Sequence, residues 1–103
     1  MQYIKLGSVG AFPHVAPTKP QALKVLEEAA GVFGAWQHTP VGALDPTMCE
    51  DRSMERYATP LIDEIADTIQ ASCNLAAALG VTDLTPYLAR CEERNRKRGR
   101  YDG

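Results

Sequence analysis

Acidic side chains occur at two places in the sequence where a divalent cation could use them. Glu27 and Glu28 are adjacent in one segment, and Glu64 and Asp67 are spaced i and i+3 in a second. On a helix, side chains spaced i and i+3 share one face. Magnesium prefers oxygen ligands, usually one or two carboxylates together with phosphate oxygens and water. The spacing therefore allows a site for a divalent cation between the two segments, although each pair alone is more typical of a solvated helix face.

Both acidic segments have the periodicity of helices, so helices must position these side chains. The first helix is predicted over 19–37 and the second over 60–79, and a third is predicted over roughly 86–97. The apolar stripe of the first comprises Ala22, Leu26, Ala29, Phe33 and Trp36, and that of the second comprises Leu61, Ile65, Ile69, Ser72, Ala76 and Leu79. If the first two helices pack antiparallel, the acids can converge between them.

Residues that typically start or end helices separate the predicted helices. The Thr-Pro pairs at 59–60 and 85–86 each combine an N-cap residue with a proline at the first helical position. Gly80 is the expected C-terminal stop of the second helix. Residues 38–58 are predicted to connect the first two helices, and residues 1–17 to form an extended N-terminal arm.

The length of 103 residues suits a single domain over residues 1–103. We expect an all-α fold made of an antiparallel helical hairpin plus a third helix. A chain of this size buries only about 60–70% of its unfolded surface, so its own core is modest. We therefore expect the chain to complete a four-helix-type bundle with copies of itself, as a homodimer or a homotetramer.

Composition narrows the class of partner. The formal net charge is −2, while six of the 11 basic residues lie in the last fourteen positions. One basic helix end on a net acidic chain with 7% aromatic residues disfavours nucleic acid as a partner. No N-terminal signal pattern and no apolar stretch long enough to span a bilayer are found, so a cytoplasmic location without a membrane partner is expected. The three cysteines suit neither a disulfide framework nor a zinc site.

The order of the acidic motifs resembles that of the MazG-like nucleotide pyrophosphohydrolases. Their signature is Glu-Glu-x-x-Glu on one helix, followed by Glu-x-x-Asp on the next and by an Asn-x-x-Arg ending. Here residues 27–31 read EEAAG, residues 64–67 read EIAD and residues 95–98 read NRKR. The resemblance covers roughly residues 20–101. It implies a hydrolase that cleaves nucleoside triphosphates between the α and β phosphates, giving a monophosphate and pyrophosphate.

The resemblance also implies roles for the acidic residues. Glu28, Glu64 and Asp67 would hold magnesium, with manganese as an alternative ion. Glu27 would be a secondary ligand or would help Glu28 to orient the attacking water, so these two are the expected catalytic residues. Gly31 stands where the family usually has its third glutamate, so one expected ligand is missing. The alternative is a non-catalytic relative that binds nucleotide or metal, or that has a structural role in an assembly.

Substrate contacts are expected from two further places. By the same resemblance, Asn95 and Arg98 would contact the phosphates, with Lys97 as a helper. A guanidinium offers two parallel donors to phosphate oxygens. The alternative for these basic residues is a solvated helix end that complements the helix dipole. Trp36 could stack on the base, and the alternative for it is a core aromatic on the same stripe as Phe33.

Overall fold

The computed structural model describes residues 1–39 and 57–103, which contain no strand. The helices in these ranges are α1 (Lys19–His38), α4 (Thr59–Ala78) and α5 (Thr85–Lys97). The all-α prediction is therefore confirmed. The predicted connection over 38–58 lies, except for its ends, outside the described residues. None of the described helices is long and apolar enough to cross a membrane.

The helix boundaries agree with the sequence-based prediction to within one residue. α1 begins after Thr18, whose Oγ1 accepts a hydrogen bond from the Gln21 amide at 3.4 Å. α4 ends just before Gly80, which has a φ of +83°. The Val81 amide donates to the Ala76 carbonyl at 2.9 Å, which satisfies a carbonyl at the helix end. Glycine adopts this left-handed conformation without a steric cost, and this explains why the chain stops the helix here.

The starts of α4 and α5 differ from the prediction. Thr59 and Thr85 were expected to cap these helices, but each is the first residue of its helix, and Ala58 and Leu84 hold the N-cap positions. At α5 a different side chain satisfies the helix start, because the Asp83 Oδ1 accepts a hydrogen bond from the Thr85 amide at 2.9 Å. A proline in the first turn, which needs no hydrogen-bond acceptor, is present in both helices as expected.

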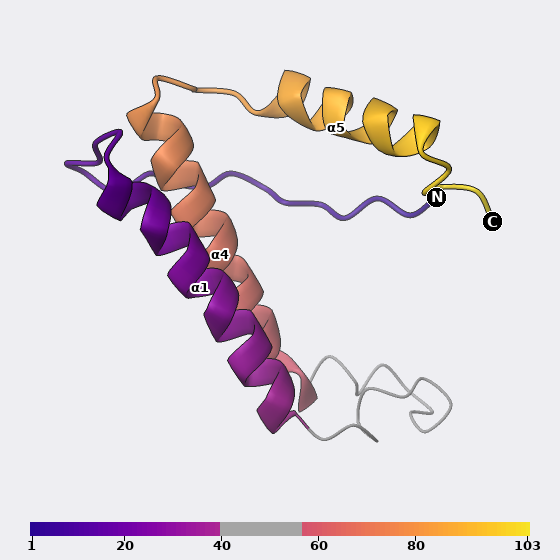
Figure 1. Cartoon of the computed structure of the whole chain (residues 1–103), viewed down its shortest axis with the longest axis horizontal. Coiled ribbons are helices and arrows are strands. Elements are labelled where there is room, and N and C mark those ends of the chain that lie inside the picture. The colour runs from indigo at the N-terminus through magenta and orange to yellow at the C-terminus, as the bar shows by residue number, and fades with distance from the viewer. Residues whose placement is uncertain (40–56) are drawn as a thin grey trace.

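Helices α1 and α4 pack side by side as an antiparallel hairpin (Figure 1). The faces that meet carry buried or half-buried residues at helical spacing. They include Val25, Glu28, Val32 and Ala35 on α1 and Leu61, Glu64, Thr68, Ala71 and Leu75 on α4. The described residues include no large side chain that is fully buried, and the buried apolar residues are Ala58 and Ala71. The predicted hairpin is confirmed, but its own core is thin.

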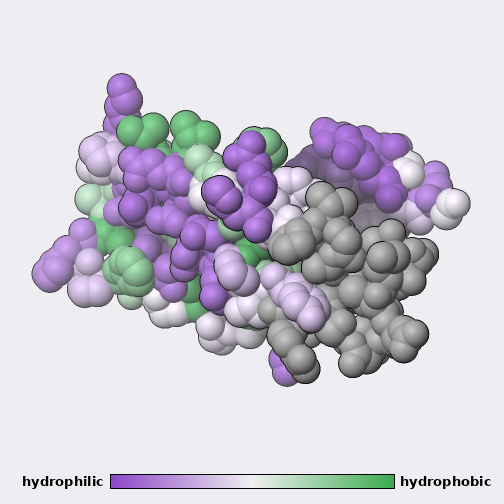
Figure 2. All heavy atoms as spheres, turned by 90° about the horizontal axis from the view of Figure 1, so that it is seen from below, coloured by the Kyte–Doolittle hydropathy of each residue, from purple (hydrophilic) through white to green (hydrophobic). Residues whose placement is uncertain are grey.

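The larger residues of the predicted α1 stripe lie on the outside of this hairpin, and the α4 stripe lies there in part. Leu26, Phe33 and Trp36 on α1, and Ile65 on α4, are 44–65% exposed, whereas Leu61, Ile69 and Ala76 of the α4 stripe are half-buried. The stripe is turned from the face that meets the other helix by roughly 100° on α1 and by roughly 70° on α4. Because the turn has the same sense along both chains and the helices are antiparallel, both stripes lie on one side of the hairpin. Figure 2 shows hydrophobic side chains at the surface among hydrophilic ones.

The N-terminal arm covers another side of α4. Asn74, which is 4% exposed, accepts a hydrogen bond at its Oδ1 from the Phe12 amide at 3.0 Å. Gln70 donates from its Nε2 to the Gly10 carbonyl at 2.9 Å and to the Asn74 Oδ1 at 3.0 Å. Side-chain amides of α4 thus hold the arm in an extended path across the helix, as Figure 1 shows.

Helix α5 packs against neither helix of the hairpin in the described part of the chain. It extends beside the N-terminal arm (Figure 1), where the Tyr3 hydroxyl donates a hydrogen bond to the Glu92 Oε1 at 2.7 Å. This bond and the charge of Glu92 raise the pKa of Tyr3. The third helix is therefore present as predicted, but it stands away from the acidic residues of the hairpin.

Candidate metal centre

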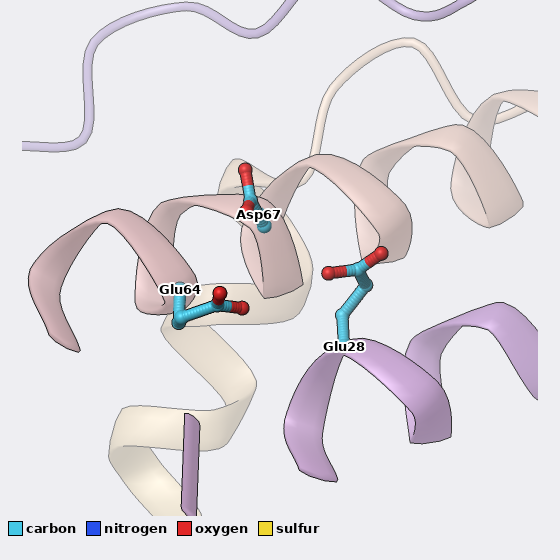
Figure 3. A group of neighbouring side chains, drawn as sticks. All are labelled: Glu28, Glu64 and Asp67. Carbon is cyan, nitrogen blue, oxygen red and sulfur yellow. The ribbon is translucent and has the colours of Figure 1, made fainter. Parts of the chain in front are cut away.

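Three acidic side chains from the two hairpin helices lie close together (Figure 3). Glu28 comes from α1, and Glu64 and Asp67 come from successive positions on one face of α4. Each offers a carboxylate oxygen that lies within 4.8 Å of the other two. Glu28 and Glu64 are half-buried and Asp67 is exposed. The antiparallel packing thus brings together the three residues that the sequence marked as metal ligands.

The cluster combines three negative charges with little compensation. Glu28 has an ion-pair partner in Lys24, whereas Glu64 and Asp67 form no ion pair within residues 1–39 and 57–103. Carboxylates this close repel one another, most strongly where water is partly excluded. A divalent cation placed among them would offset this repulsion.

A glycine shapes the space in which one of these carboxylates lies. A Cβ built on Gly31 would lie 2.6 Å from the Glu64 Oε2 and 3.3 Å from its carboxyl carbon. The Glu64 carboxylate therefore lies against the backbone of α1, in a space that a side chain at position 31 would fill. The possible ligands are carboxylate oxygens from two helices. Oxygen ligands of this kind fit a hard cation such as Mg²⁺ or Mn²⁺.

Glu27 lies outside the cluster. Its exposed side chain pairs with Lys24 at 3.4 Å, and the same ammonium group also lies 3.4 Å from the Glu28 carboxylate. Hydrogen bonds to Glu27 and, second, to Glu28 raise the pKa of Lys24. The catalytic role expected for Glu27 therefore stays a prediction without a close approach to Glu64 or Asp67.

Lys24 is the residue that the sequence-based interpretation missed. It stands four positions before Glu28 and three before Glu27, and these are the spacings at which helical side chains form ion pairs. It also borders a shallow pocket of about 100 Å³ that opens beside the acidic cluster. The residues that line this pocket are Phe12, Lys24, Glu28, Asp67, Gln70, Ala71 and Asn74. Pockets that enclose a small-molecule ligand usually measure about 300–1,000 Å³, so residues 1–39 and 57–103 by themselves form too small a pocket here to enclose a nucleotide.

The residues predicted to contact substrate are not brought to the cluster within one chain. Asn95 and Lys97 lie on α5 and Arg98 directly follows it, and this helix does not pack on the hairpin. The Asn95 Nδ2 instead donates to the Cys91 Sγ at 3.5 Å. Trp36 lies two turns of α1 beyond Glu28 and is half-exposed, so in the single chain it belongs neither to the cluster nor to a core.

The chain matches no known protein family, no curated protein and no solved structure. The geometry of the cluster and the motif resemblance are therefore what a functional proposal rests on.

Proposed function

We propose that this chain is a magnesium-dependent pyrophosphohydrolase that converts a nucleoside triphosphate into the monophosphate and pyrophosphate. The observation that carries the proposal is the meeting of Glu28, Glu64 and Asp67, whose oxygens lie within 4.8 Å of one another. Two helices far apart in sequence bring these acids together, in the order and spacing of the MazG-like motif. The type of reaction is inferred from the family resemblance, and the proximity of the three carboxylates supports a metal-dependent reaction of this type.

In this proposal the three carboxylates hold the ion, and the open positions around it are left to phosphate oxygens and water. A bound divalent cation supplies neutralisation of the phosphate charge and polarisation of the phosphorus–oxygen bonds. Glu64 and Asp67 share one face of α4 and would hold the ion from that helix. Glu28 contributes from the opposite side, and Glu27 is the candidate for orienting the attacking water. Lys24, which pairs with Glu28 and borders the pocket beside the cluster, is a candidate for contact with the phosphates.

The hairpin has an exposed apolar face that could mediate the oligomer expected from the chain length. We propose that a second copy covers this face and completes a four-helix-type bundle. The face carries Leu26, Phe33, Trp36 and Ile65, and leaving it in water would forgo the burial that a chain with a thin core needs. In such a homodimer or homotetramer, α5 of another copy can bring Asn95, Lys97 and Arg98 to the phosphates.

The proposed reaction is tested by incubating the purified protein with a panel of ribo- and deoxyribonucleoside triphosphates. We expect release of pyrophosphate and the monophosphate when Mg²⁺ is present, and none when EDTA replaces it. Replacing one ligand, Glu64→Gln or Asp67→Asn, should lower the rate more than about 100-fold, because even outer-shell residues of metal sites contribute roughly 10- to 100-fold. A folded wild-type protein that turns over no nucleotide would contradict the proposal.

A second candidate is a non-catalytic relative that binds nucleotide or metal without hydrolysis. The observation that favours it is Gly31, which contributes no ligand to the cluster. Under this alternative the wild type binds Mg²⁺ but is inactive, and Gly31→Glu creates activity when its carboxylate replaces the Glu64 oxygen that its Cβ displaces. An active wild type whose rate is not raised by this substitution excludes the alternative.

A further inference from the structure

Two glycines interrupt α1, and their surroundings differ. Gly31 lies one turn after Glu28, and a Cβ there would contact the Glu64 carboxylate. Gly34 lies three positions later, and a Cβ there would meet nothing within 4 Å. Glycine inside a helix is less favourable than alanine because it leaves the unfolded chain more freedom. At Gly31 there is a steric reason for the glycine, because a larger residue would contact Glu64. At Gly34 no such contact explains the glycine.

We propose that Gly31 is a positioning residue of the metal site, an inference that rests on the function proposed above. Because it has no side chain, the Glu64 carboxylate can lie over the α1 backbone, beside Glu28. Gly31 thus acts through Glu64 and does not touch the ion itself. Gly31 stands where the family has a further glutamate, and the space that this side chain would occupy holds the Glu64 carboxylate from α4.

The size of the effect follows from the contact distance. With a methyl group at position 31, the Glu64 Oε2 would have to move from 2.6 Å to the 3.4 Å at which ordinary contact begins, a retreat of about 0.8 Å. The carboxylate is the flexible end of a long side chain, so it can turn away while the helices stay in place. Mg²⁺ requires near-octahedral geometry with ligand distances of about 2.0–2.1 Å, so we expect a carboxylate that has turned away from position 31 to bind it more weakly.

The experiment compares Gly31→Ala with Gly34→Ala, which make the same chemical change in the same helix. Mg²⁺ affinity is measured by isothermal titration calorimetry and Mn²⁺ affinity by electron paramagnetic resonance. Gly31→Ala should weaken both affinities by roughly tenfold or more, the range for residues that orient metal ligands. Gly34→Ala should leave both unchanged. In EDTA, both variants should melt at or above the wild-type temperature, because alanine favours the helix.

A double-mutant cycle with Glu64→Ala separates a positioning role from a general one. If Gly31 acts through Glu64, adding Gly31→Ala to Glu64→Ala should cause no further loss of affinity. Equal ion affinities of wild type and Gly31→Ala would overturn the inference and leave the proposed function standing. A further tenfold loss in the Glu64→Ala background would overturn it as well. A wild type that binds neither ion would contradict both the inference and the metal-dependent function.

Discussion

At the scale of residues, the candidate site depends on which acids reach across the hairpin. Glu28 and Glu64 lie on the faces where α1 and α4 meet, and Asp67 lies at the edge of that contact. Glu27 is adjacent to Glu28 in sequence, but a step of about 100° around the helix carries it to the exposed side. Helical geometry thus separates two neighbouring glutamates into a candidate ligand and a surface residue paired with Lys24.

Lys24 competes with a metal ion for the Glu28 carboxylate, which it approaches to 3.4 Å. Removing its charge by Lys24→Gln should raise Mg²⁺ affinity about two- to fivefold, the small effect of an exposed ion pair. Lys19→Gln removes the same charge from the same helix at a position with no ion pair among the described residues, and it should have a smaller effect. Calorimetric titration of both variants checks this, and a loss of affinity in Lys24→Gln would show that the lysine supports the site.

Spacing alone identified two acidic segments and placed Glu64 and Asp67 on one helix face, and the motif resemblance selected Glu28 in place of Glu27 as the third acid. The sequence was not sufficient to explain Gly31. As a sequence position, this glycine is only a missing ligand. Its contact with Glu64 depends on the distance between two helix backbones, which no spacing rule provides. Lys24 was predictable from its i+3 and i+4 spacing to the two glutamates. The motif resemblance instead points to basic residues near the C-terminus as the phosphate contacts.

At the scale of elements, the helices were predicted closely because their signals are local. The prolines in the first turns and Gly80 at the end of α4 act within a few residues of the boundary. The orientation of the apolar stripes could not be predicted from such local signals. α1 carries apolar residues on two faces, with Val25 and Val32 against α4 and Leu26 and Phe33 outside. Periodicity identifies the wider stripe, but it does not tell which face the neighbouring helix takes.

The start of α5 should depend on pH through Asp83. The hydrogen bonds from Thr85 lower the pKa of Asp83 below its usual 3.8. A lowered pKa in the folded chain contributes stability that is present above the unfolded value and is lost as the pH falls through the folded value. Exchange of the Thr85 amide hydrogen should therefore be slowed at neutral pH and lose this protection below about pH 3.8, beyond the intrinsic pH dependence of exchange.

Two substitutions separate the charge of Asp83 from its capacity to accept a hydrogen bond. Asp83→Ala should remove the protection of the Thr85 amide at every pH. Asp83→Asn retains an acceptor oxygen, so it should keep part of the protection and remove its titration at acidic pH. If the wild-type protection does not change between pH 6 and pH 2, Asp83 is not what holds this helix start.

At the scale of the whole molecule, the single chain is a hairpin with one apolar face, an arm along another side and a helix that stands apart (Figure 1). Its core contains small residues such as Ala71, and larger ones such as Leu26 and Phe33 remain in contact with water. A four-helix arrangement would reverse this distribution. Such an assembly was expected from chain length and from the family resemblance, but its proposed geometry depends on a surface that only the folded hairpin defines.

Charge placed on the apolar face should therefore dissociate the assembly. We expect sedimentation equilibrium to give the mass of at least a dimer for the wild type. Leu26→Glu or Phe33→Glu should weaken association by at least about 100-fold, because a carboxylate buried without a partner is costly. His38→Glu adds a carboxylate to an exposed position of α1 away from the stripe and should leave the mass unchanged. A wild type that sediments as a monomer at high concentration would contradict the proposed assembly.

The most direct test of the metal centre is crystallographic. Crystals of the protein grown or soaked with saturating Mn²⁺ should show an anomalous difference peak between α1 and α4, with one carboxylate oxygen each from Glu28, Glu64 and Asp67 at coordination distance. The same peak should disappear in crystals of Glu64→Ala. Well-diffracting wild-type crystals in which Mn²⁺ binds only elsewhere, with the three carboxylates turned apart into solvent, would contradict the account.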